Sequence, residues 1–361
     1  MKLSDLTRRR AEWLRGTAPM GHVVISSRAR LARNLAGMPF LSRCSPEQLS
    51  EIAERLRRTL GKVGLPGETF YADVEAADPL DRQLLVERHL ISRQQADAKG
   101  PRGVAVASGE AVAVMVNEED HLRVQVLRAG LQLDSCYAEL RRLDALLEGH
   151  LTFAFSSRFG YLTACPTNVG TGLRVSVMLH LSALKMTGEI EKALRAARDM
   201  HLAVRGLHGE GTEPTGDLFQ VSNQVTLGKS EVEIISEFRD QIVPGIIEYE
   251  RRAREALLKN RRIALQDRIS RAGAVLRSAR LISSEETMFL LSQLRLGLSL
   301  ELVDGIGLET INELSLMVQP AHLQRLTGRE MSPAERGEAR ADLVRKRLSA
   351  GGKAGSGNGG G

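Results

Sequence analysis

The chain has 361 residues, a formal net charge of +6 and 42% apolar residues, which suits one large globular domain or two. No apolar run approaches the roughly 20 residues of a membrane span, and the charged start MKLSDLTRRRAEWLRG does not resemble a secretion signal. The three cysteines are scattered without a CxxC pair, which excludes a disulfide framework and predicts a cytoplasmic location.

The first two thirds of the chain contain patterns of both helices and strands. Helices are predicted over residues 1–20, 46–60, 172–186 and 189–200. Strands are predicted over residues 23–26, 103–108, 111–117, 122–127, 151–156 and 218–223. Because these elements do not alternate as βαβ units, and strands joined by a short turn pair antiparallel, we expect an α+β fold with a mostly antiparallel sheet.

From about residue 230 the pattern changes to helices alone. Three serine–glutamate pairs have the spacing of capping boxes: Ser230 with Glu233, Ser283 with Glu286, and Ser332 with Glu335. The last third is therefore predicted to be a helical domain. Residues 350–361 are mostly glycine, have too little side chain to bury, and are predicted to be disordered.

Three adjacent carboxylates interrupt two predicted strands. The stretch VNEEDHLRVQV (116–126) places Glu118, Glu119 and Asp120 at the turn, where Asn-Gly or Asp-Gly would turn more easily. Such a cluster repels itself unless cations neutralise it. A second acidic group, Glu210 and Glu213, lies in a glycine-rich loop.

Arginines lie beside turns and glycines in the same part of the chain. They are Arg28, Arg30, Arg123, Arg174 and Arg205. Taken singly, each suits a surface ion pair, but together they would neutralise a triphosphate, because guanidinium groups bind phosphate oxygens bidentately. No GxxxxGK[ST] motif is present. Phosphate-binding arginines facing paired carboxylates suit a flat cationic substrate such as a guanidinium group.

A separate basic region spans residues 251–280, which hold many arginines and few acids. Such a face suits nucleic acid or an acidic protein, or it is a solvated helix surface. We favour the solvated surface and expect no nucleic-acid partner.

Four strings in order, SSRARLARN, NEEDHLRV, CPTNVGTGLR and RGLHGEGTE, resemble the catalytic domain of the phosphagen (guanidino) kinases. The resemblance covers roughly residues 22–255 and implies a curved antiparallel sheet flanked by helices, similar to the glutamine synthetase catalytic domain. The domains expected are an N-terminal helix (1–21), the catalytic domain (22–255), a helical regulatory or substrate domain (256–349) and a disordered tail (350–361).

The resemblance also implies roles for individual residues. The residues that it places at ATP are Ser26, Ser27, Arg28, Ala29, Arg30, His89, Arg123, Arg174, Val175, Ser176, Val177, Met178, Arg205, Gly206, Leu207, His208, Gly209 and Glu210. Glu119 matches the catalytic carboxylate and Glu213 the second carboxylate that holds the guanidinium. Cys165 matches a reactive cysteine beside the substrate, although its pattern alone suits a small buried residue. On pattern alone, His89 would lie on the surface.

The helical domain after the catalytic domain, with none before SSRAR, resembles the arrangement of bacterial protein arginine kinases. Those enzymes carry an RDxxRA motif that forms an allosteric phosphoarginine pocket. The matching residues here are Arg336, Gly337, Glu338, Ala339, Arg340 and Ala341, with Gly337 in place of the aspartate. A simple basic helix face is the alternative. Within RGLHGEGTE, His208 and Gly211 also depart from the small-molecule kinases, and the glycine would widen the substrate mouth.

The implied activity is transfer of the ATP γ-phosphoryl group, with Mg²⁺, to arginine side chains of proteins in a stress response. Mg²⁺ bridges phosphate oxygens and needs few protein ligands, so no metal-ligating residue is expected. The implied partners are a zinc-binding activator protein, a heat-shock repressor, a Clp protease and a second copy of the chain. The alternatives are a kinase for free arginine or another small guanidine, and a non-catalytic adaptor that reads phosphoarginine.

Overall fold

The computed structural model describes residues 3–206 and 215–351, and an eight-stranded sheet in the order β2-β3-β4-β5-β1-β8-β10-β9 lies at its centre. The strands of this sheet are β1 (Val24–Arg33), β2 (Phe70–Asp73), β3 (Gly103–Val106), β4 (Val112–Val116), β5 (Leu122–Ala129), β8 (Leu173–His180), β9 (Leu202–Arg205) and β10 (Leu218–Asn223). All neighbouring strands pair antiparallel. The predicted α+β fold with an antiparallel sheet is confirmed.

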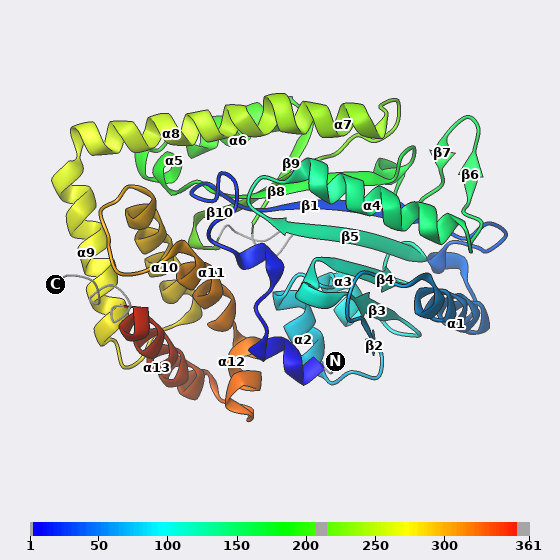
Figure 1. Cartoon of the computed structure of the whole chain (residues 1–361), viewed down its shortest axis with the longest axis horizontal. Coiled ribbons are helices and arrows are strands. Elements are labelled where there is room, and N and C mark those ends of the chain that lie inside the picture. Colours follow the sequence, from blue (N-terminus) through cyan, green and yellow to red (C-terminus); the bar gives the residue numbers. More distant parts are fainter. Residues whose placement is uncertain (1–2, 207–214, 352–361) are drawn as a thin grey trace, which may run out of the picture.

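Helices lie on both sides of the sheet. They are α1 (Pro46–Val63), α2 (Pro79–Glu87), α3 (Arg93–Asp97), α4 (Leu133–Glu148), α5 (Ser182–Thr187), α6 (Ile190–Asp199), α7 (Glu231–Glu237), α8 (Val243–Asn260), α9 (Arg262–Ser278), α10 (Ser284–Ser299), α11 (Leu308–Met317), α12 (Pro320–Thr327) and α13 (Pro333–Gly351). In Figure 1, α4, α6, α7 and α8 run along one side, while α10–α13 gather on the other side near α2 and the N-terminal segment.

The helical last third is also confirmed, since no strand follows β10 in the part of the chain that the structure describes. Reciprocal capping boxes begin α7 at Ser230 and α13 at Ser332, whereas Ser283 only accepts the hydrogen bond from Glu286 N. Helix α8 runs through the boundary expected between residues 255 and 256. Helix α13 continues to Gly351, and residues 352–361 of the expected tail lie outside the described residues.

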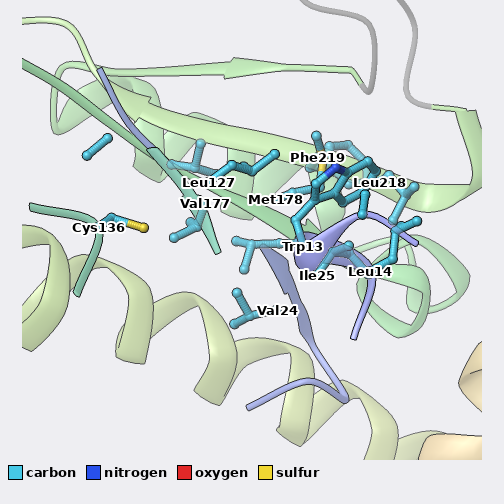
Figure 2. Packing of buried hydrophobic residues seen from close by; sticks show 14 of the residues in the cluster. Trp13, Leu14, Val24, Ile25, Leu127, Cys136, Val177, Met178, Leu218 and Phe219 are labelled. Carbon is cyan, nitrogen blue, oxygen red and sulfur yellow. The ribbon is translucent and has the colours of Figure 1, made fainter. Parts of the chain in front are cut away.

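The two faces of the sheet differ in chemistry because strand residues alternate between faces. In β1, Ala29 and Leu31 are almost fully buried in the main hydrophobic core, whereas Arg28 and Arg30 are only partly buried. Aliphatic side chains from β1, β5, β8 and α4 dominate this core, and Figure 2 shows Trp13 and Leu14 beside Ile25 within it. The polar side chains of the opposite face remain available for a site.

The expected helix over residues 1–20 is wrong. The segment instead forms two short 3₁₀ helices, Leu3–Arg8 and Glu12–Leu14. Trp13 and Leu14 are 6% and 3% exposed, and their packing on the sheet determines the path of this segment. Burial of large apolar side chains contributes more free energy than local helix propensity, which spans less than ~1 kcal/mol per residue.

The expected helix over residues 172–186 is also wrong. Residues 173–180 form the central strand β8, and only Ser182–Thr187 are helical. Almost every side chain of β8 is buried, but its sequence LRVSVMLH alternates apolar residues with Arg174, Ser176 and His180, and the helix prediction overlooked this strand signal.

Smaller differences concern other strands. Strand β1 is longer than predicted, and β2 and β9 were not predicted. Within 151–156, Phe155–Ser156 (β6) pairs with Gly160–Tyr161 (β7), and Phe153 forms an isolated bridge with Leu35.

A buried ion pair joins the sheet to α4. The Arg33 side chain is fully buried, and its Nη2 donates to Asp144 Oδ2 at 2.7 Å while its Nε donates to Oδ1 at 3.1 Å. Nη1 donates to the carbonyls of Ala32 and Thr171, and the guanidinium carbon lies 3.4 Å from the centre of the Tyr161 ring.

No helix in the described part of the chain is long and apolar enough to cross a membrane.

Removing one partner of this pair should destabilise the fold strongly. Asp144→Ala leaves the buried Arg33 charge uncompensated, so we expect the free energy of unfolding to fall by about 3–5 kcal/mol in denaturant titrations. Asp134→Ala on the same helix is the matched control, because its partner Arg239 is exposed and such pairs contribute ~1 kcal/mol or less. Equal losses in the two variants would contradict this assignment.

Candidate active site

A cleft of about 560 Å³ lies on the polar face of the sheet. Five arginines predicted from the sequence line it: Arg28, Arg30, Arg123, Arg174 and Arg205. They come from four different strands, β1, β5, β8 and β9, so the sheet brings together residues that are far apart in sequence. Glu119, Cys165 and His89 line the same cleft.

Strand register explains why the arginines converge. Arg30 lies directly opposite Arg174 across the β1–β8 pair, and Arg28 lies opposite Ser176. Residues two apart on a strand point to the same face, so Arg28 and Arg30 both face the cleft. Like charges directly opposite each other destabilise a sheet, which indicates that this face is built for an anion.

The arginine side chains donate mainly to neutral acceptors. Arg28 donates from Nη2 to Gln220 Oε1 at 2.6 Å and from Nε to Ser176 Oγ at 3.3 Å, and Arg174 donates from Nη2 to Ser222 Oγ at 2.9 Å. The buried Nε of Arg30 has no acceptor within residues 3–206 and 215–351. These contacts orient the guanidinium groups of Arg28 and Arg174 without supplying a negative charge, since their acceptors are an amide and hydroxyl groups.

The electrostatic cost of this arrangement appears in the pKa values. Burial, followed by the charges of Arg123, Arg174 and Arg205, lowers the pKa of Arg28 to about 9. Burial and the neighbouring Arg28 likewise lower the pKa of Arg30 well below its usual value. A bound polyanion would relieve this repulsion and favour the charged guanidinium forms.

The three carboxylates of the acidic turn have different surroundings. Glu118 is almost fully buried and accepts hydrogen bonds from Arg123 Nη1 at 2.6 Å and from Ser92 Oγ. Burial alone would raise its pKa, but Arg123 and Ser92 hold the pKa of Glu118 below its usual value. Glu118 therefore fixes Arg123 in the cleft.

Asp120 and His121 hold neighbouring loops in place. Asp120 Oδ1 accepts hydrogen bonds from Asn34 Nδ2 and Ala164 N, both at 2.6 Å, and burial raises its pKa. His121 Nδ1 accepts from Leu35 N at 3.0 Å, so the neutral ring donates from Nε2 to Pro39 O at 2.8 Å. Burial lowers the pKa of His121, consistent with this neutral form.

Glu119 is the member of the turn that remains available for chemistry. Its carboxylate lines the cleft and accepts no hydrogen bond from the residues that the structure describes. Burial raises its pKa, and the charges of Glu118 and Asp120 add to the increase against the opposing effect of Arg123. A carboxylate with a raised pKa in a cleft suits a cationic ligand or a proton-transfer step.

His89 and Cys165 lie elsewhere in the cleft wall. The sequence pattern alone predicted His89 on the surface and Cys165 in the interior, whereas both are partly buried. His89 has a φ of +59° and its ring packs edge-on against Trp13, with ring centres 5.1 Å apart. Cys165 is partly exposed, and its Sγ lies 3.0 Å from Thr167 Oγ1.

Other residues expected at ATP do not reach this cleft. Ser26, Ser176 and Met178 line a smaller neighbouring cavity of about 50 Å³, which shares Arg28 and His89 with the cleft. The side chains that face the opposite side of the sheet are those of Ser27, Ala29, Val175 and Val177. Gly206 is the last described residue before residue 215. The remaining predicted site residues lie outside the described residues: Leu207, His208, Gly209, Glu210 and Glu213.

The cleft also contains residues that sequence reasoning missed. Ser92, Arg93, Gln220 and Asn223 line it. Gln220 and Ser222 alternate with apolar residues along the predicted strand 218–223, and this alternation is a signal that could have placed Gln220 on the polar face. Nothing in the local sequence places Ser92 and Arg93, because their position depends on the packing of α3.

The expected phosphoarginine motif lies on α13. Arg340 is 3% exposed and donates from Nε to Val318 O at 2.9 Å and from Nη1 to Ile282 O at 3.0 Å, so it is not part of a simple exposed helix face. Arg336 donates to Met331 O at 2.7 Å. A Cβ atom at Gly337 would lie 2.7 Å from Leu281 Cδ1, so an aspartate here would require Leu281 to move.

The basic region 251–280 is partly neutralised. Arg251 and Arg252 pair with Glu248, and Arg271 pairs with Asp267. Arg254 is buried and pairs with Glu250 at 2.8 Å. These contacts agree with a solvated helix surface over most of the region.

Comparison with known families agrees with the cleft. Residues 51–253 match the ATP:guanido phosphotransferase C-terminal catalytic domain, and residues 262–357 match the protein-arginine kinase McsB C-terminal domain. The fold and the cleft together therefore define an ATP-dependent guanidino phosphotransferase.

Similar proteins specify the branch of that class. The protein-arginine kinase of Symbiobacterium thermophilum is 48% identical over 96% of this chain and 98% of its own length, and that of Bacillus subtilis is 41% identical over 94% and 93%. The chain belongs to the protein-arginine kinase family. Among solved structures, a lombricine kinase is 28% identical with a TM-score of 0.55 and is matched over 63% of this chain and 66% of that one. A duplicated taurocyamine kinase from Schistosoma mansoni is 29% identical with a TM-score of 0.56, over 64% of this chain and 33% of that one.

Replacing Arg30 should stabilise the ligand-free protein while weakening its anion site. Arg30→Met keeps the length of the side chain but removes the unpartnered Nε and the repulsion from Arg174, so we expect the free energy of unfolding to rise by about 1–2 kcal/mol. Denaturant titration measures the change, with Arg271→Met on exposed α9 as control. A loss of stability in Arg30→Met, with the control unchanged, would show that the cleft is not strained by its own charge.

Proposed function

We propose that this chain transfers the γ-phosphoryl group of ATP to arginine side chains of other proteins, with the arginine-lined cleft as the catalytic centre. The observation that carries the proposal is the meeting of five arginines with the unpaired carboxylate of Glu119 in one cleft. The arginines suit the phosphates, and the carboxylate suits the guanidinium group. The protein-arginine kinase names of its relatives support a protein substrate.

ATP would bind with its phosphates among Arg28, Arg30, Arg123, Arg174 and Arg205. Their repulsion in the free protein is relieved by the phosphate charge, so the binding energy comes from groups already oriented by Gln220, Ser176, Ser222 and Glu118. The smaller cavity beyond Arg28 and His89 continues the same site. Ser26, Ser176 and Met178 would meet the remainder of the nucleotide there.

Mg²⁺ would arrive bound to the nucleotide. No group of three or more histidine, cysteine or acidic residues suited to a metal exists within residues 3–206 and 215–351. The cation would be held chiefly by phosphate oxygens, and Glu118 is already paired with Arg123. When bound, the ion would neutralise part of the phosphate charge.

Glu119 would act on the substrate guanidinium. A guanidinium group has a pKa above ~12, so its nitrogen is a poor nucleophile until a proton leaves. Glu119 would hold the cation and accept that proton as the nitrogen attacks the γ-phosphorus and the bond to the β–γ bridging oxygen breaks. Glu213, by family resemblance, would hold the other side of the guanidinium. Cys165 would lie beside the substrate.

Further parts of the proposal rest on the resemblance. We propose that Arg336 and Arg340 contribute to a phosphoarginine pocket that regulates activity, despite Gly337. We also propose a cytoplasmic homodimer that acts with a zinc-binding activator protein, a heat-shock repressor and a Clp protease that degrades marked proteins in stress. The cytoplasmic location is supported by three cysteines that form no disulfide with one another.

Removing the charge of Glu119 should lower kcat more than it lowers the affinity for ATP. For Glu119→Gln we expect kcat to fall by ~10²-fold or more, the usual contribution of a general base. In the wild-type protein, turnover should fall as the pH drops through the raised pKa of Glu119, because only the ionised form accepts a proton. Glu139→Gln on α4 is the control, and near-normal kcat in Glu119→Gln would remove the assignment.

The class of substrate can be measured directly. Incubation with Mg-ATP and either an arginine-rich protein or free arginine should give acid-labile phosphate on protein arginines, with kcat/KM at least ~10-fold above that for free arginine. Mass spectrometry locates the phosphate. Comparable transfer to free arginine would favour a small-guanidine kinase, and ATP-independent phosphoarginine binding without turnover would favour an adaptor.

A further inference from the structure

A second basic cavity of about 250 Å³ lies where the N-terminal segment meets the C-terminal helices. Its basic lining residues are Arg8, Arg9, Arg10, Arg88, His322 and Arg347. The cavity shares no lining residue with the catalytic cleft and none with the motif at 336–341, and it shares only the apolar Leu14 and Leu316 with the smaller cavity beyond Arg28. The proposed function therefore does not account for it.

Two buried polar side chains form part of its wall. Arg88 and His322 are each 1% exposed, and Arg88 Nη1 lies 2.8 Å from His322 Nε2. Because arginine has only donors, Nε2 must accept, and the neutral ring carries its proton on Nδ1. Burial, followed by the charge of Arg88, lowers the pKa of His322 to about 3, which agrees with the neutral ring.

The Nδ1–H group of His322 is left without an acceptor. Nδ1 is buried and has no hydrogen-bond partner in the part of the chain that the structure describes. A buried donor without a partner destabilises the fold, because it has lost its hydrogen bond to water without gaining another. Arg88 cannot relieve this cost, because a guanidinium group has no acceptor, and its Nε and Nη2 donate to Glu110.

Not all of the cationic lining is neutralised. Arg9 pairs with Glu68 at 3.0 Å, and Arg10 pairs with Glu309 at 2.7 Å and with Glu313, the carboxylate that also lines the cavity. Arg8 and Arg347 form no ion pair within residues 3–206 and 215–351. Both are exposed, and they reach the cavity from opposite ends of the chain.

We propose that this cavity binds a small phosphate-bearing anion, held by Arg8 and Arg347 at the mouth and by the unpartnered Nδ1–H group of His322 in the wall. Guanidinium groups match phosphate oxygens bidentately, and the His322 donor would gain the acceptor that it lacks. Donors approach from the N-terminal segment, from α13 and from the wall, which suits a tetrahedral phosphate better than a planar carboxylate. The volume is several times the ~30 Å³ that a water molecule occupies in the liquid.

The test measures phosphate binding to the full-length chain by isothermal titration calorimetry. All proteins carry Arg30→Met and Arg174→Gln, which weaken binding in the catalytic cleft. In this background we compare the unaltered cavity, the double variant Arg8→Gln/Arg347→Gln, and the matched control Arg262→Gln/Arg277→Gln on exposed α9. Both double variants remove two positive charges, so they differ only in position.

The cavity variant should bind inorganic phosphate at least about tenfold more weakly, while the control keeps the affinity of the background protein. Thermal unfolding checks that both variants are folded. A second titration with AMP identifies the source: equal dependence on the cavity arginines indicates phosphate carried by a nucleotide, and binding of inorganic phosphate alone indicates the free ion. Absence of saturable binding of both probes, or equal losses in both double variants, would overturn the proposal.

Discussion

The mutual repulsion of guanidinium groups on one face of the sheet is the constraint on which the rest of the site depends. Register places Arg30 directly opposite Arg174, with Arg28 close by. Such an arrangement is unfavourable in itself, so a rigid scaffold must hold it. The opposite face supplies that rigidity, because its aliphatic side chains pack against α4 in a continuous core. Stability from apolar burial thus maintains a face preorganised for a polyanion.

In the acidic turn, negative charges lie side by side and must likewise be stabilised by the fold. Three adjacent carboxylates would repel one another, but the fold gives two of them fixed partners. Glu118 is held by Arg123 and Ser92, and Asp120 by Asn34 and the backbone of Ala164. The side chain of Glu119 lines the cleft. One carboxylate therefore positions a cleft arginine, one fixes the loops, and one lines the cleft without accepting a hydrogen bond from any described residue.

Much of the fold and of the site could be predicted from the sequence, wherever the signal was local. The 3.6-residue period predicted α1, and turn-linked runs of β-branched residues predicted β3, β4 and β5. The prediction failed at β8, where LRVSVMLH does alternate as a strand, because the helical segment Ser182–Thr187 that follows was extended back over it. The different roles of Glu118 and Glu119 could not be predicted, since Ser92 reaches Glu118 only through the packing of distant elements.

One short stretch, Glu87 to His89, joins α12 directly to the wall of the catalytic cleft. The buried Glu87 carboxylate accepts hydrogen bonds from the backbone N–H groups of Ala321 and His322, at 2.9 and 2.8 Å, at the start of α12. An anion is favoured there, because the N-terminus of a helix carries unsatisfied donors and a positive dipole end. The next residue, Arg88, contacts His322, and the one after it, His89, lines the catalytic cleft. Three consecutive residues thus connect α12, the buried ion pair with Glu110 and the cleft wall. A shift of α12 would therefore have to move His89 or break buried polar contacts, which makes the helical region a structural support of the site.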